Sequence, residues 1–390
     1  MTINTFDTII LGAGAAGLMA ALTAGRRGRR VLLLDHADEA GKKILISGGG
    51  RCNFTNLGTV PDRFLSTNRH FARSALARYT PRDLIALVEK HHIAWHEKML
   101  GQLFCDVSAR QIVQMLLDEC RAGGVDLRLG HSITDVSRGE GFAVQTDHGA
   151  FTAPSLILAT GGLSIPKLGA SGVSYSIAKK FGLKLTETRP ALVPLTFAGA
   201  DLDLMQPLSG VALPVRAKWG KIGFDEAMLF THRGLSGPAI LQISSYCPPG
   251  GEIMLDLLPG KDARGQLLFG KTNRPRAELR TVLGELVPTR LAAALAPDIG
   301  KIGEIPNKRI EALAAQLSGW KLKPTGTEGY AKAEVTMGGI DTAGLSSQTM
   351  MSETVPGLFA IGEAVDVTGW LGGYNFQWAW SSGFVAGSSV

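Results

Sequence analysis

Cysteine is scarce in this sequence. The four cysteines among 390 residues are Cys52, Cys105, Cys120 and Cys247, and no two of them form a C-x-x-C pair. Such wide spacing argues against a disulfide framework and against a zinc site, and it fits a reducing compartment. We therefore predict a cytoplasmic protein without a bound metal.

Long runs of one kind of residue are also missing. No apolar stretch approaches the roughly 18 residues of a membrane-spanning helix, and the apolar start of the chain lacks the basic segment of a signal peptide. The net charge of +6 is spread along the chain, without a run of about five or six Lys or Arg. We therefore expect a protein that binds no membrane, and a nucleic-acid partner is not expected either.

Glycine is abundant, with 49 residues, and its most informative cluster lies near the start of the chain. The pattern there predicts a strand, a helix and a second strand at residues 8–11, 18–24 and 31–34. A G-x-G-x-x-G motif stands between the first strand and the helix. This order of elements is typical of a dinucleotide-binding βαβ unit.

Each residue of this motif has a physical task. Gly12 allows a tight turn, Gly14 lets a pyrophosphate approach the backbone, and Gly17 lets the helix pack closely on the sheet. The start of the helix offers free N–H groups to the phosphates. Asp35 ends the second strand, where a carboxylate can accept hydrogen bonds from ribose hydroxyls. The sequence therefore predicts a dinucleotide site.

Two further glycine-rich stretches favour the same interpretation. Residues 40–56 contain three successive glycines before Arg51 and predict a basic loop that exposes its backbone to phosphate or to a flavin edge. Cys52 in this loop has no second cysteine nearby, so a redox role is not expected. Near the end of the chain, a predicted strand at residues 358–361 runs into a glycine-rich loop that opens a last helix.

The remaining stretches indicate an insertion. Residues 65–92 read as mainly helical, and residues 132–153 as short strands. Prolines and alternating patterns over residues 190–258 predict a β-rich part, and residues 260–322 read mainly as helices. In the β-rich part, His232 lies at a turn before a helix, where it can face a ligand or simply cap the turn.

Several stretches together resemble one known family. They include GAGAAGLMAA, GKKILISGGGRCNFTN and PGLFAIGEAVDVTGWLGGYN, and they are similar to stretches of the HI0933-like flavoproteins, also called BaiN-type NAD(P)/FAD-dependent oxidoreductases. The resemblance implies an α/β fold, with a two-dinucleotide-binding (Rossmann-like) FAD domain, a β-rich insert domain and a small helical subdomain. The FAD domain would comprise residues 1–189 and 331–390, the β-rich insert residues 190–258, and its helical part residues 259–330.

The resemblance also implies which residues bind FAD without a covalent bond. The phosphate and adenosine end would be held by Gly12, Gly14, Ala15, Ala16, Gly17, Asp35, Ile133, Thr160 and Gly161. The basic loop would contribute Lys43, Gly50, Arg51, Cys52 and Asn53, and the ribityl and flavin end would contact Gly362, Glu363, Asp366, Gly373, Tyr374 and Asn375. One departure is Asp at position 35, where such flavoproteins commonly have the longer Glu.

These features predict an FAD-dependent oxidoreductase that acts on a small molecule by hydride transfer at the flavin. NAD(P)H is the expected electron donor. No second G-x-G-x-x-G follows a predicted strand, so donor and substrate would share one cleft, which predicts ping-pong kinetics. The candidate catalytic residues are His232 and Tyr374, with Trp370 near the substrate.

Other functions stay open at this point. One is amine oxidation with oxygen, because the family includes amine oxidases as well as reductases of conjugated C=C bonds. Another is an FAD-dependent tRNA-modifying enzyme, whose RNA binding would weaken steeply with salt. A flavin-binding scaffold or redox sensor without turnover is a further alternative, and so is NAD in place of FAD at the first motif.

Overall fold

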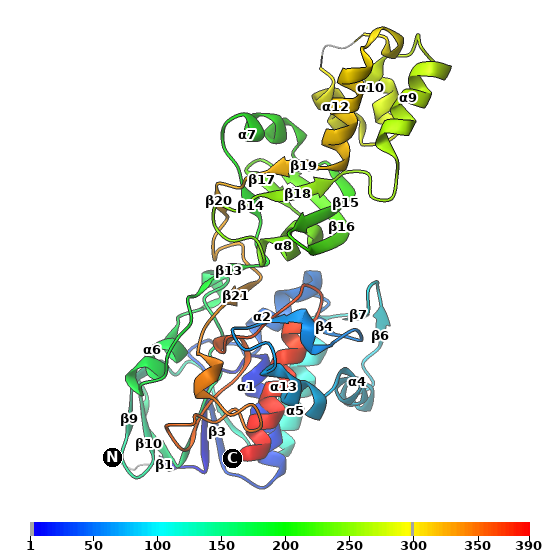
Figure 1. Cartoon of the computed structure of the whole chain (residues 1–390). Helices are drawn as coiled ribbons and strands as arrows, with labels where there is room; N and C mark the ends of the chain where they lie inside the picture. Colours follow the sequence, from blue (N-terminus) through cyan, green and yellow to red (C-terminus); the bar gives the residue numbers. More distant parts are fainter. Residues whose placement is uncertain (1–3, 298–299) are drawn as a thin grey trace. The chain divides into compact units, whose positions relative to one another are not determined.

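The computed structural model describes residues 4–297 and 300–390. The chain divides into two compact units (Figure 1). Unit 1 comprises the chain up to Arg189 together with Val335–Val390, and unit 2 is Pro190–Glu334. Unit 1 is therefore made from both ends of the sequence.

Unit 1 is built on a parallel sheet of five strands, in the order β22, β12, β2, β3, β8. Their bounds are Leu358–Ala360, Ser155–Leu158, Thr8–Leu11, Val31–Leu34 and Asp126–Arg128. Every residue of β2 and β3 is buried, as expected of parallel strands that are covered on both faces. The predicted α/β fold with a Rossmann-like core is confirmed.

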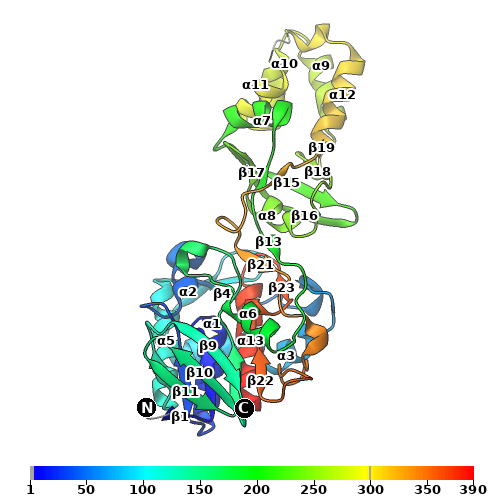
Figure 2. The ribbon, with the colours of Figure 1, turned by 90° about the vertical axis from the view of Figure 1, so that its left-hand side faces the viewer.

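The first and last helices of unit 1 lie side by side (Figures 1 and 2). They are α1, Ala15–Arg26, and α13, Tyr374–Ser389. A Cβ atom at Gly383 would stand 2.5 Å from the carbonyl oxygen of Ala16, and one at Gly387 would stand 2.4 Å from that of Ala20. Glycine is therefore required for this close contact between the two ends of the chain. Helix α1 starts at Ala15, earlier than the predicted Leu18, because Gly14 already serves as its N-cap.

The stretch predicted as mainly helical over residues 65–92 is two helices. These are α3, Ala72–Arg78, and α4, Pro81–Lys90. The break comes at Thr80, whose hydroxyl accepts from the backbone N–H of Asp83 while the Asp83 carboxylate accepts from the N–H of Thr80. This capping box, followed by proline in the first helical turn, starts a new helix.

The predicted loop over residues 40–56 is also more ordered than expected. It contains α2, Lys42–Ile46, a 3₁₀ turn over Ser47–Gly50 and β4, Asn53–Asn56. Only the glycines keep the loop character, because Gly48 and Gly49 adopt left-handed φ angles of 57° and 66°.

The other elements of unit 1 surround this core. The helices are α5, Ala109–Ala122, and α6, Val173–Lys180. A four-stranded sheet pairs β1, Asn4–Thr5, with β11, Gly149–Ala153, then β10, Phe142–Thr146, and β9, Ile133–Arg138. Smaller sheets pair β4 with β7, Gln102–Cys105, and β6, Trp95–Glu97, and pair β5, Phe64–Leu65, with β23, Thr368–Gly369. The returning chain enters unit 1 at β21, Val335–Met337.

Unit 2 consists of a seven-stranded sheet and a group of helices. The strands, in sheet order, are β19 Trp320–Leu322, β18 Ile253–Asp256, β15 Ala212–Trp219, β16 Ile222–Thr231, β17 Gly234–Ser236, β14 Leu195–Thr196 and β20 Gly326–Thr327. Helices α7, Gly199–Met205, and α8, Pro238–Ser244, accompany the sheet. Helices α9 Ala263–Asn273, α10 Leu279–Gly284, α11 Thr289–Leu295 and α12 Asn307–Ser318 form the helical part of the unit (Figure 2).

Among the residues described, no helix has both the length and the apolar character needed to cross a membrane.

Candidate functional site

The glycine-rich turn after β2 uses its three glycines in two different ways. A Cβ at Gly12 would stand 2.5 Å from the Ala159 carbonyl oxygen, and one at Gly17 only 1.8 Å from the carbonyl oxygen of Gly12. These two positions are constrained by packing. In contrast, a Cβ at Gly14 would meet no atom within 4 Å. Gly14 therefore faces open space at the start of α1, where the first N–H groups have no partner inside the helix.

Asp35 connects this turn to the end of β3. One carboxylate oxygen accepts from the backbone N–H of Ala13 at 2.7 Å, and the other accepts from that of Ala37 at 2.8 Å. The side chain is 15% exposed. The backbone N–H of His131 donates to the Asp35 carbonyl oxygen at 2.9 Å, which places Ile133, two residues further on, close to the same strand end. The predicted ribose and adenine contacts of Asp35 and Ile133 stay predictions.

More glycines face open space beside the strand ends. Gly49, Gly50 and Gly161 have φ angles of 66°, 85° and 76°, and a Cβ at any of them would meet no atom within 4 Å. Next to Gly161, the hydroxyls of Thr160 and Ser174 lie 2.7 Å apart. These glycines leave their backbone accessible, as a dinucleotide-binding surface requires.

Arg51 and Cys52 follow the glycines, and their side chains differ in environment. Arg51 is exposed, whereas Cys52 is fully buried with a φ angle of 51°. Burial raises the pKa of the Cys52 thiol far above its ordinary value, although a hydrogen bond with Ser47 lowers it in part. A buried, protonated thiol is a poor redox group, so Cys52 can face a cofactor only through its backbone.

A polar cluster joins four segments that lie far apart in the sequence. Lys43 Nζ lies 2.6 Å from Glu363 Oε2 and 2.6 Å from Ser164 Oγ. The Ser164 hydroxyl donates to Glu363 Oε1 at 2.8 Å, and the backbone N–H of Thr336 donates to the same oxygen at 2.9 Å. The cluster follows β12 and β22, at the carboxyl edge of the parallel sheet, where ligands of α/β proteins bind.

Sequence reasoning found only half of this cluster. Lys43 and Glu363 were predicted, whereas Ser164 and Thr336 were missed. The signal was present, because Ser164 directly follows the LATGGL stretch and Thr336 belongs to EVTMGGI. The Ser164 hydroxyl and the Thr336 backbone N–H both donate to a carboxylate from another segment, and such a pairing is not visible in the sequence.

The loop before α13 is held by its own polar side chains. The Asn375 amide accepts from the backbone N–H of Gly369 at 2.8 Å and donates to the carbonyl oxygen of Gly369 at 2.9 Å. A Cβ at Gly373 would stand 2.4 Å from the Thr55 carbonyl oxygen. Asn53, in the orientation that satisfies both ends of its amide, accepts from the N–H of Gly373 at 3.3 Å. Strand β4 and the loop before α13 therefore meet at this point.

Asp366 and Gly362 also make contacts that the sequence did not reveal. The Asp366 carboxylate, 4% exposed, accepts from the backbone N–H and the hydroxyl of Thr67 at 2.9 and 2.7 Å. The N–H of Gly362 donates to the Ser382 hydroxyl at 3.1 Å. A direct cofactor contact of either residue stays a prediction.

The two candidate catalytic residues have different surroundings. Tyr374, 3% exposed, accepts a hydrogen bond from Arg63 through its phenol oxygen, and the Arg63 guanidinium lies 5.2 Å from the ring centre of Trp370. His232 is exposed in unit 2, at the turn between β16 and β17. The Thr231 hydroxyl accepts from the backbone N–H of Arg233 and so supports that turn. No metal-binding cluster of His, Cys, Asp or Glu is found among the described residues.

Comparisons with known proteins place this geometry in context. The model of the HI0933-like protein Rossmann domain matches residues 6–389. The chain is 51% identical to the ribosomal RNA dihydrouridine synthase of Escherichia coli K12, over 99% of this chain and 98% of that protein. It is 46% identical to the protein of the same name from Haemophilus influenzae, over 98% of each chain. It is also 29% identical to the 3-dehydro-bile acid delta(4,6)-reductase of Clostridium scindens, over 98% of each chain.

A solved structure supports the fold. A quinol-fumarate reductase matches 99% of this chain and 71% of its own chain with a TM-score of 0.53, at 15% sequence identity. At such low identity the likeness concerns the fold alone.

The relatives overturn two predictions. The expected small-molecule substrate and the absence of a nucleic-acid partner are wrong, because full-length relatives at 51% and 46% identity are named for a reaction on ribosomal RNA. The RNA-modifying alternative is the better reading, with ribosomal RNA in place of tRNA. The prediction failed because an RNA-binding surface does not need one continuous run of Lys and Arg, since folding can bring separated cations together.

Proposed function

The chain belongs to the HI0933-like protein family, and we propose that it is a dihydrouridine synthase that acts on ribosomal RNA. The observation that carries this proposal is the 51% identity to the Escherichia coli enzyme of that name over nearly the whole of both chains. The predicted FAD-dependent oxidoreductase activity is confirmed at the level of the family.

The residues of unit 1 fit FAD as the cofactor. The open backbone at Gly14, Gly49, Gly50 and Gly161 gives phosphate and sugar groups room to approach, and the start of α1 offers unpaired N–H groups and a positive dipole end. FAD supplies hydride transfer when it is bound. We propose that Gly14 to Gly17 hold the pyrophosphate and that Asp35 holds the ribose of the adenosine.

The Lys43–Glu363 pair is the proposed contact for the polar edge of the cofactor. The pair is held in place by Ser164 and Thr336, so its geometry is set before any ligand arrives. Such preorganisation lowers the cost of ordering the site on binding. Asn53, Gly373 and Asn375 would line the same side, because their hydrogen bonds fix the loop that opens α13.

The reaction adds two hydrogens to the C5=C6 bond of uracil. One carbon takes a hydride and the other a proton, so uridine, NAD(P)H and one proton yield dihydrouridine and NAD(P)⁺. We propose NAD(P)H as the donor, and the cytoplasm as the compartment because ribosomal RNA is made and assembled there. The relative from Clostridium scindens is named for a reduction at delta-4 and delta-6 double bonds, which is the same class of C=C reduction.

Of the two candidate catalytic residues, we propose different roles. Because only 3% of the Tyr374 surface is exposed and its oxygen accepts a hydrogen bond from Arg63, we propose that Tyr374 positions Arg63 and the loop before α13. His232 is exposed, so it is the candidate with access to a large substrate.

A complementation experiment tests the function. This chain is expressed in an Escherichia coli K12 strain that lacks its own ribosomal RNA dihydrouridine synthase, and dihydrouridine in digested ribosomal RNA is measured by mass spectrometry. We expect the nucleoside to return with the wild-type chain and to stay absent with the Gly14→Val variant. Folded, flavin-loaded wild-type protein that leaves the ribosomal RNA without dihydrouridine would refute the proposal.

A spectroscopic experiment tests the donor. The purified yellow protein is mixed with NADH or NADPH without oxygen, and bleaching of the flavin band is followed. If neither NADH nor NADPH bleaches the band while dihydrouridine still forms in cells, NAD(P)H is excluded as the donor and the proposed synthase activity is not affected.

A further inference from the structure

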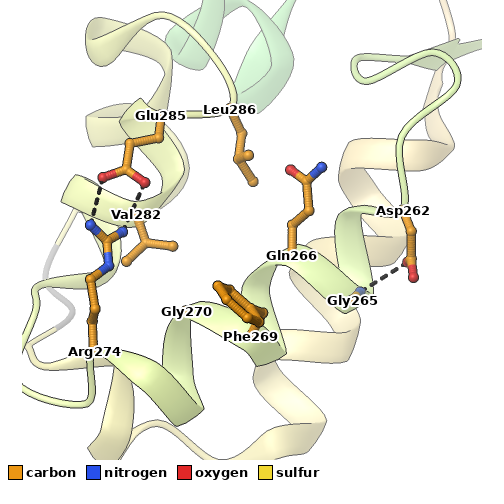
Figure 3. A pocket seen from close by; sticks show the side chains of 9 residues that line it. All are labelled: Asp262, Gly265, Gln266, Phe269, Gly270, Arg274, Val282, Glu285 and Leu286. Atoms are coloured by element: carbon orange, nitrogen blue, oxygen red, sulfur yellow. Dashed lines mark hydrogen bonds and ion pairs between the residues drawn. The ribbon is translucent and has the colours of Figure 1, made fainter.

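The helical part of unit 2 contains a cleft that the proposed reaction does not use. Its volume is roughly 500 Å³ and it lies between α9 and the segment from α10 to Leu286 (Figure 3). Phe269 and Gln266 project from α9, and Val282 and Leu286 line the opposite side. The Arg274–Glu285 ion pair closes one end, with two N–O distances of 2.9 and 2.8 Å. The cleft is therefore apolar in the middle and polar at its end.

Phe269 is the most unusual residue of this cleft. It is 70% exposed, whereas α9 buries Ala263, Leu267 and Gly270 in the interior of the helical part. The ring therefore contributes little to the core. Its exposed face is therefore available to a planar ligand such as a nucleobase.

Charge is concentrated in the same part of the chain. Residues 261–319 contain ten Lys or Arg and six Asp or Glu, a net charge of +4, whereas residues 190–260 contain four and six, a net charge of −2. Three of the ten cations, Arg264, Arg274 and Arg280, pair with carboxylates. Lys261 and Arg276 are exposed, make no ion pair among the described residues, and flank the lining residues Asp262 and Arg274.

We propose that this helical part is the docking site for the RNA substrate, with an unpaired base stacked on Phe269. The inference rests on the proposed function and adds a binding site to it. Stacking on an aromatic ring suits every base, because every base has a flat π-face. The Gln266 amide carries a donor and an acceptor, so it can pair with the edge of the stacked base. Lys261 and Arg276 supply charge for the flanking phosphates.

The charge pattern favours RNA over an apolar peptide as the occupant. A peptide groove would need only the apolar lining, whereas the net charge of +4 over residues 261–319, with Lys261 and Arg276 near lining residues in the sequence, favours an anionic ligand. Enzymes that act on a base must take it out of the stacked helix, so a stacking surface such as Phe269, outside the cofactor site, would help to hold the opened strand.

Variants of Phe269 test the stacking contact in the full-length flavin-loaded protein. The probe is a fluorescein-labelled single-stranded oligouridine, and its dissociation constant is measured by fluorescence anisotropy between roughly 50 and 300 mM KCl, a range over which affinity for phosphates falls with salt. We expect Phe269→Ala to weaken binding on the order of tenfold and Phe269→Trp to restore it. Val107→Ala removes another exposed apolar side chain, in unit 1, and should leave binding unchanged.

A second pair of variants tests the charges. Lys261→Gln combined with Arg276→Gln should reduce the slope of log K against log salt by about 1.4, since each phosphate contact to a single strand contributes about 0.7. Flavin content and the rate of flavin reduction by NADPH should match the wild type in the Phe269 variants and in the double charge variant, because Lys261, Phe269 and Arg276 all lie in unit 2.

The outcomes separate this inference from the proposed function. If ribosomal RNA is modified in cells but Phe269→Ala and the double charge variant bind RNA like the wild type, the docking site is refuted and the synthase stands. If Phe269→Ala instead loses a crosslink to a ribosomal protein with RNA affinity unchanged, the cleft is a protein-binding site and the RNA inference is wrong. Wild-type protein that neither binds nor modifies RNA would overturn both.

Discussion

Gly14 offers the sharpest test of the cofactor site, because its two roles can be separated. Its φ and ψ angles of −84° and −169° are open to any residue, and a Cβ there meets no atom within 4 Å. Gly14→Ala should therefore fold normally. The loss of a favourable N-cap, about 0.5–1 kcal/mol, is offset by about 0.4–1 kcal/mol from the reduced entropy of the unfolded chain.

The same Cβ stands where the pyrophosphate would approach the backbone. Losing one or two hydrogen bonds to a charged phosphate costs about 1.5–3 kcal/mol each. We therefore expect the dissociation constant for FAD to rise on the order of 100-fold, while the melting temperature of the apoprotein changes by less than about 2 °C.

Gly17→Ala is the matched control. Its Cβ would stand 1.8 Å from the carbonyl oxygen of Gly12, so the backbone itself must move. We therefore expect the free energy of unfolding to fall by about 3 kcal/mol or more, the upper end of what overpacked sites cost. Apoprotein is prepared by removing the flavin, then titrated with FAD by fluorescence quenching and melted by circular dichroism. Wild-type FAD affinity in Gly14→Ala, or equal destabilisation by the two variants, would contradict the reasoning.

Three further predictions concern single side chains. Lys43→Met removes the cation of the pair proposed to contact the cofactor and should weaken FAD binding on the order of tenfold, since one hydrogen bond from a charged group contributes about 1.5–3 kcal/mol. Lys42→Met breaks only a pair with the exposed Asp38 and should leave the FAD-binding curve unchanged. Burial raises the pKa of Glu119, but hydrogen bonds from Lys90, His91 and Arg26 lower it by more, so the pKa is about 2 instead of the ordinary 4.5. The Glu119 carboxylate therefore stabilises the folded state above pH 4.5, and this stabilisation is lost as the pH falls toward 2. Glu119→Gln should thus lower the free energy of unfolding in urea by up to roughly 3 kcal/mol at pH 6, and a difference that stays constant down to pH 3 would show that the carboxylate is not responsible. Cys52→Ser should keep the bound FAD content and the rate of the proposed dihydrouridine formation within about twofold, because the buried thiol is protonated and inaccessible. Loss of turnover with FAD still bound would assign this cysteine a chemical role.

Local sequence patterns were sufficient for the central elements of unit 1. Strands β2 and β3 have the bounds that the patterns predict, because the apolar character of a strand buried on both faces is set within a few residues. The family resemblance pointed to Lys43 and Glu363, which come from opposite ends of the chain and form an ion pair, while their contact with a cofactor stays a prediction. Boundaries were less certain where a capping residue decides, as at Thr80.

Contacts between distant segments were decided only by the tertiary structure. Ser164 and Thr336 join Lys43 and Glu363, and Thr67 engages Asp366, across separations of up to 320 residues. No periodicity encodes such pairs, because they arise when strand ends from separate parts of the chain meet at one edge of a sheet.

The basic helical part of unit 2 shows the same division. The sequence by itself determined how many cations residues 261–319 carry and that Phe269 is aromatic. Only the packing of α9 and α10 left Phe269 exposed beside a cleft. Exposure is a property of the packed helices, because the same phenylalanine turned by one third of a helical turn would lie in the core.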